Sequence, residues 1–112
     1  MEPNQRIAAE LERAAIARSE GNEGMARVCA RRAVGLAVTE YLRKNDIQVN
    51  GLRSYDLLRN LSLRNHLPEA VHPGLSKLSL TVDENHNLAD GIDLINEAKL
   101  IIHKLTEEVQ AS

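Results

Sequence analysis

The segment LADGIDLINEAKLIIHKLTEEV, residues 88–109, decides the fold because its apolar side chains repeat with the period of an α-helix. These side chains follow one another in steps of three and four residues, which places them on one helical face. The members of this stripe are Leu88, Ile92, Ile95, Ala98, Ile102, Leu105 and Val109. Leu94 and Ile101 widen it, so we expect a closing helix that packs on the rest of the chain and leaves surface for a second subunit.

A second long helix is predicted from Glu23 to Lys44, with Asn22 as its N-cap. Between Ala33 and Val38 every residue is apolar or glycine. A helix without a polar face must be surrounded by other helices. This helix is therefore the expected centre of the fold, and its small side chains would let a neighbour approach closely; they are Ala26, Ala30, Ala33 and Ala37.

The remaining segments also predict helices. A first helix is expected from about Pro3 to Glu20, before Gly21, which suits the left-handed position after a helix end. Its expected inner face consists of Ile7, Leu11, Ala14 and Ala15. Residues 45–53 are typical of a loop, a short helix starting at Ser54 would end before Pro68, and another is expected near residues 73–80. The sequence thus predicts one all-α domain over residues 1–112, an up-and-down bundle of about four to five helices.

The composition narrows the class of protein. Cys29 is the only cysteine, so neither an intramolecular disulfide nor a cysteine-based zinc site can form, and a cytoplasmic location is expected. The chain has no Phe or Trp, which removes the usual platforms for stacking single-stranded bases. Because no apolar run approaches about 18 residues and no secretion signal is present, we expect no contact with a membrane.

Two further patterns concern charge. The net charge of -2 combines a basic first part, which holds all the arginines, with an acidic second part. Arg27 and Arg31 lie one helical turn apart with Arg32 adjacent, so this face is a candidate for binding phosphates. The alternative is an ordinary solvated face, because Glu23 precedes Arg27 by four residues, the spacing of a surface ion pair. His86 and Asp90 have a spacing that could hold a metal, but acidic residues are expected near a helix start anyway. We predict neither a metal nor a cofactor.

The segment from Gly24 to Lys44, followed by a loop and then by Ser54-Tyr55-Asp56-Leu57-Leu58, resembles the HEPN family, the nucleotide-binding domain of higher eukaryotes and prokaryotes. In that family a long second helix leads through a loop to a segment that commonly begins His-Asp-Leu, of which Tyr55-Asp56-Leu57 looks like a variant. The resemblance covers residues 11–105. It implies a HEPN-like helical bundle, binding of a nucleotide or of nucleic acid, and pairing with a nucleotidyltransferase partner.

Active HEPN proteins cleave RNA with an Arg that is followed, after four to six residues, by a His. Arg59, followed by Asn60, fits this spacing because six residues separate it from His66. The resemblance implies that His66 would move a proton and that Arg59 would stabilise charge on the phosphate, without a metal. However, a chain with this many arginines and histidines is expected to contain about one such match by chance. In the family the motif also lies near the start of the closing helix, whereas Pro68 follows His66 almost at once.

We therefore predict a HEPN-like homodimer that binds a nucleotide, RNA or a nucleotidyltransferase partner, without robust catalysis of its own. Two alternatives from other classes stay open. The first is a metal-independent dimeric ribonuclease of the toxin-antitoxin type that uses Arg59, Asn60 and His66. The second is a purely structural helical homodimer.

Overall fold

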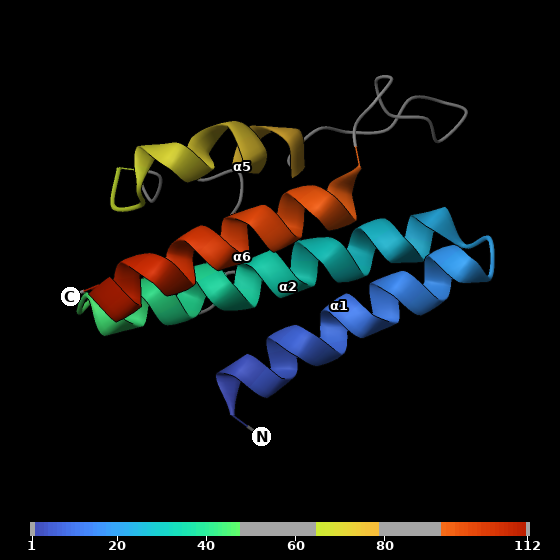
Figure 1. The fold of residues 1–112 in the computed structure, drawn as a ribbon, viewed down its shortest axis with the longest axis horizontal. Helices are drawn as coiled ribbons and strands as arrows, with labels where there is room; N and C mark the ends of the chain where they lie inside the picture. The colour runs from blue at the N-terminus through green and yellow to red at the C-terminus, as the bar shows by residue number, and fades with distance from the viewer. Residues whose placement is uncertain (1, 48–64, 79–92, 112) are drawn as a thin grey trace.

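The computed structural model describes residues 2–47, 65–78 and 93–111 of the chain, and its regular elements are all helices (Figure 1). These are α1 (Pro3–Ser19), α2 (Glu23–Lys44), the short 3-10 helix η1 (Glu69–Val71), α5 (His72–Leu78) and α6 (Leu94–Ala111). The all-α prediction is confirmed for these ranges. The helix predicted to start at Ser54 lies outside the described residues, so the number of helices in the bundle stays a prediction.

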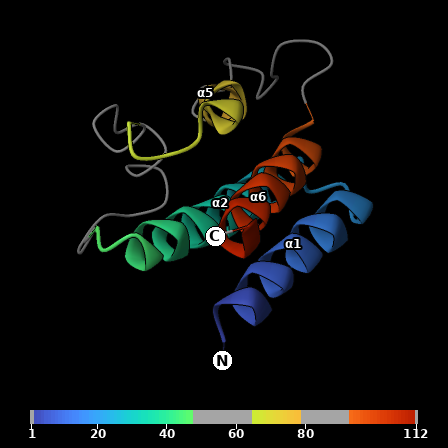
Figure 2. The ribbon, with the colours of Figure 1, turned by 60° about the vertical axis from the view of Figure 1, so that its left-hand side comes forward.

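The helices form a layered arrangement around α2. α1 and α2 make an antiparallel hairpin, α6 lies along α2 and runs in the same direction, and α5 packs on α6 in the opposite direction (Figures 1 and 2). Consecutive described helices therefore alternate in direction, as in an up-and-down bundle. α1 is an outer helix that packs mainly on α2 and touches α6 little.

The core confirms the central position of α2. Ala26, Ala30, Ala33 and Val34 are fully buried, and α2 contacts both α1 and α6. The buried side chains of the described residues are all apolar or cysteine. Because alanine and valine are short, two helices can approach α2 from different sides without a gap, which keeps the packing dense.

The turn between α1 and α2 has the geometry expected from the sequence. Gly21 has a φ of 80°, which L side chains rarely adopt. The backbone N–H of Asn22 donates to the carbonyl of Ala17 over 2.8 Å, which closes the end of α1. The Asn22 side chain then accepts from the N–H of Met25 over 3.0 Å and caps α2. This turn fixes the hairpin on which the α1–α2 surface depends.

The closing helix starts later than its apolar period predicts. α6 begins at Leu94, and Asp93 is its cap, because Oδ1 of Asp93 accepts from the N–H groups of Ile95 and Asn96 over 3.1 and 3.2 Å. The prediction that the helix already includes Asp93 is therefore wrong. Leu88 and Ile92 lie outside the described residues. The stripe itself is used inside the subunit, since Leu94, Ile95, Ala98, Ile101 and Leu105 are buried.

α5 is held against α6 by a close backbone approach. A Cβ atom at Gly74 would lie 2.8 Å from Cδ1 and 2.9 Å from Cγ1 of Ile101, so only glycine fits there without a shift. Lys77 of α5 also pairs with Glu97 of α6 over 3.1 Å. These contacts give α6 a second neighbour besides α2.

Candidate functional site

Two of the three arginines predicted to bind an anion are engaged within the subunit. Nε of Arg31 donates to the carbonyl of Leu78 over 2.8 Å, at the end of α5 where helix carbonyls lack intrahelical partners. Nε of Arg27 lies 4.0 Å from Oε2 of Glu23, and the Arg27 side chain is only 13% exposed. A phosphate at this face would compete with these contacts. The largely buried Arg27 side chain does not fit the alternative of an ordinary solvated face either, so both arginines have a structural role here.

Arg32 lies on a different face of α2. It is exposed and lines a groove between α1 and α2, together with Arg13 of α1. The structure therefore does not bring Arg27, Arg31 and Arg32 together as one arginine cluster.

Of the three predicted catalytic residues, only His66 lies within the described residues. His66 is exposed in the turn before η1, while Arg59 and Asn60 lie outside the described residues, as do His86 and Asp90. Within the described ranges, no group of three or more His, Cys, Asp or Glu side chains is placed to hold a metal ion. The catalytic roles of Arg59, Asn60 and His66 therefore stay predictions.

A network of charged side chains joins three helices at one end of the bundle. Arg18 of α1 donates to Glu23 of α2 over 2.6 Å and to Asp93, the cap of α6, over 2.9 Å. The hydrogen bonds from Arg18 lower the pKa of the Glu23 and Asp93 carboxyl groups, and the bond to Glu23 is the largest cause that raises the pKa of Arg18. All three groups stay charged at neutral pH, so the network fits a structural tie better than proton transfer.

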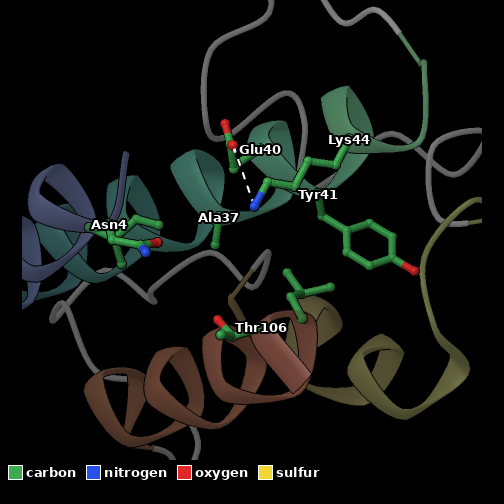
Figure 3. Close-up of a pocket in the computed structure, with 8 residues that line it drawn as sticks. Asn4, Ala37, Glu40, Tyr41, Lys44 and Thr106 are labelled. Carbon is green, nitrogen blue, oxygen red and sulfur yellow. Dashed lines mark ion pairs between the residues drawn. The ribbon is translucent and has the colours of Figure 1, made fainter. Parts of the chain in front are cut away.

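A small hollow lies at the other end of the bundle, where the start of α1 meets the last turns of α2 and α6 (Figure 3). Its volume is about 110 Å³, and it is lined by Asn4, Ile7, Ala37, Glu40, Tyr41, Lys44, Leu105 and Thr106. Lys44 lies 3.9 Å from Glu40, whose carboxylate also accepts from Arg43 over 2.6 Å. Ligand pockets are usually larger, about 300 Å³ or more, so this hollow suits water better than a nucleotide.

The larger hollow is an open groove between α1 and α2, with a volume of about 360 Å³. Its lining residues recur on one face of each helix; they are Arg13, Ile16, Ala17 and Glu20, then Asn22, Met25, Cys29 and Arg32. Ala17 and Cys29 are buried at its base, whereas Ile16 and Met25 are 49% and 45% exposed. Val28, on the same side of α2, is 37% exposed. The groove is therefore the place where large apolar side chains gather on the described surface.

Charged groups surround the base of this groove. Arg13 pairs with Glu10 over 3.1 Å. Burial of the Cys29 thiol, followed by the nearby Glu10 carboxylate, raises the pKa of Cys29 above its ordinary value, so this thiol is protonated and unreactive at neutral pH. Cys29 acts here as a small apolar side chain, as the sequence suggests.

Sequence reasoning missed this groove. The predicted inner face of the first helix included Ala15, which is exposed, while Ala17 is buried. The available signal was the position of Ile16 and Met25, two large apolar residues that lie off the predicted stripes.

No helix in the described ranges is long and apolar enough to cross a membrane. Comparisons of the chain with protein-family models, with curated proteins and with solved structures give no match.

Proposed function

We propose that this protein is a helical binding module that recognises another protein chain through the groove between α1 and α2. The observation that supports this most is the pair of half-exposed side chains Ile16 and Met25, which stand over a buried base. Adjacent large apolar side chains on a soluble domain usually mark a surface that another chain covers.

The chemistry of the groove suits a protein partner. Its centre is apolar, and its rim carries Arg13, Glu20 and Arg32, which is the usual arrangement of a protein interface. It is open along its length, and a groove between two helices can receive the apolar face of a third. Covering Ile16 and Met25 removes apolar area from water, and each Å² buried contributes about 25 cal/mol of binding free energy. Apolar burial rather than charge would therefore supply most of the affinity.

This proposal keeps the partner-binding part of the HEPN-like prediction, including a nucleotidyltransferase as one such partner. It gives less weight to a nucleotide or RNA, because Arg27 and Arg31 already contact Glu23 and Leu78. The ribonuclease alternative depends on Arg59, which the structure does not describe, so it remains a hypothesis without geometric support.

A photo-crosslinking residue with a benzophenone side chain, placed at Met25, tests the proposal in cells that produce the full chain. We expect a discrete covalent adduct, because the partner chain would lie within reach of the reactive group. Leu100 of α6 is the matched control position, since it is 49% exposed, close to the 45% of Met25, and does not line the groove. Adducts that form equally from both positions, or none from position 25, would show that the groove binds no protein.

A further inference from the structure

We infer that the chain that occupies the α1–α2 groove is a second copy of this protein, related to the first by a twofold axis. The inference rests on the function proposed above and names its partner. It follows from the order of charges along the groove, from the position of the apolar side chains, and from the outer location of α1.

The groove has an acidic end and a basic end. Glu20 lies beside the turn, with Asn22, whereas Arg13 and Arg32 lie at the opposite end. On α1, Arg13 and Glu20 are separated by seven residues, or about 10 Å along the helix axis. Ile16, the half-exposed side chain of α1, lies between them. The apolar part of the groove is therefore near its midpoint.

Arg32 and Glu20 have no ion-pair partner within the described part of the chain. Both are exposed, and neither belongs to the ion pairs of the hairpin, in which Glu10, Glu23 and Glu40 are the acidic partners. Because they lie at opposite ends of the same groove, they do not neutralise each other inside one subunit. A partner that presents the same charges in reverse order would satisfy both.

A second copy turned by 180° about an axis through the middle of the groove is such a partner. That rotation places Arg32 opposite Glu20 of the partner subunit and, by symmetry, repeats the same pair at the other end. It also brings the apolar midpoints of both grooves together. The alternative without reversal would place arginine against arginine, which is unfavourable, so the charges select one orientation.

The place of α1 in the fold agrees with this assembly. α6 is covered by α2 and α5, but α1 packs mainly on α2 and has little contact with α6. Two hairpins packed groove to groove would form a four-helix bundle in which α1 has neighbours on two sides. The assembly thus covers the least covered described helix.

Sedimentation of the purified full chain, with charge-exchanged variants, tests the inference. We expect the natural chain to form a dimer, and Arg32→Glu or Glu20→Arg alone to weaken it by about tenfold or more, because each change creates two like-charged pairs. The double variant restores opposite charges across the same axis, so its dimer should regain most of the lost affinity. Circular dichroism confirms that each variant is folded, and Leu100→Ser serves as the control that should not change association.

A natural chain that stays monomeric at about 1 mM, or a double variant that is as weak as the single variants, would overturn the second copy as occupant. The cross-linking experiment then separates the two proposals. An adduct from position 25 with a different protein would still support the binding groove, whereas a dimer with charge rescue and an adduct of twice the chain's mass supports both.

Discussion

The two covers of α2 differ in how completely they bury their apolar side chains. On one side, α6 buries nearly all of its described apolar stripe and leaves Leu100 exposed. On the other side, the α1–α2 hairpin leaves Ile16, Met25 and Val28 in contact with water. α6 has a second neighbour in α5, whereas α1 lies at the edge of the described fold. The number of neighbours, rather than the breadth of the stripe, thus decides what stays exposed.

The largest expected effect is on α6, where two leucines of one helix have opposite environments. Leu105 is 2% exposed and Leu100 is 49% exposed. Leu105→Ala should lower the free energy of unfolding by about 2 to 5 kcal/mol, because it removes buried methyl groups and leaves a cavity. Leu100→Ala should change it by less than about 0.5 kcal/mol. Urea denaturation measures both, and equal losses would remove the distinction between buried and exposed positions on α6.

The next effect tests why α5 can cover α6. Gly74→Ala places a Cβ atom against two atoms of the Ile101 side chain, so we expect a loss of about 1 to 3 kcal/mol in the free energy of unfolding. Combining it with Ile101→Val, which shortens the opposing side chain, should recover part of that loss. Thermal denaturation of the three variants checks this, and an unchanged midpoint for Gly74→Ala would mean that α5 is not tightly seated.

A smaller effect separates the two kinds of arginine on α2. Arg31→Met removes the donor to the Leu78 carbonyl, and we expect a loss of about 1 kcal/mol in stability. Arg32→Met, in the groove, should leave the stability of the monomer nearly unchanged. This distinction matters for RNA-binding experiments, because an Arg31 variant can lose binding simply by displacing α5. Weaker RNA binding would indicate a phosphate site at Arg31 only if α5 stays in place. Hydrogen exchange of the α5 amides provides that measurement.

The smallest expected effect concerns the charged tie between the two covers. The pKa values of Glu23 and Asp93 are lowered in the folded protein by their hydrogen bonds to Arg18. Their contribution to stability is therefore complete above the unfolded-state pKa values of about 4 and is lost as the pH falls through the lower folded-state values. Both carboxylates are half exposed, so solvent keeps the contribution small.

Arg18→Met tests this pH dependence. The difference in unfolding free energy between the natural chain and this variant should shrink from pH 7 to pH 2, because the carboxylates lose their charge. A difference that is constant with pH would mean that Arg18 acts through packing of its methylene groups alone.

Much of the fold follows from local sequence, as the hairpin shows. Gly21 and Asn22 define the turn because Gly21 adopts a positive φ and the Asn22 side chain accepts a backbone N–H of α2. α2 has the predicted bounds. The start of α6 was predicted wrongly because Asp93 fits both a polar helical face and a cap, and the hydrophobic period does not distinguish the two. Ala15 was misplaced for a similar reason, since alanine is compatible with either environment.

The groove could not be predicted from the periods of single helices. It exists because the packing of α1 on α2 brings Ile16 and Met25 to the same groove. The width of the groove depends on how closely the small side chains of Ala17 and Cys29 let the two helices approach. The bond from Arg31 to the carbonyl at the end of α5 could not be predicted either, because it depends on where α5 packs.

The buried thiol at the base of the groove also gives the hairpin a built-in kinetic probe. Because Cys29 is 2% exposed and protonated at neutral pH, an alkylating reagent should reach it mainly when α1 separates from α2 in a local opening. The rate of modification then reports how often that opening occurs, without unfolding of the whole domain. If a second copy holds the hairpin closed, the rate should fall as the protein concentration rises.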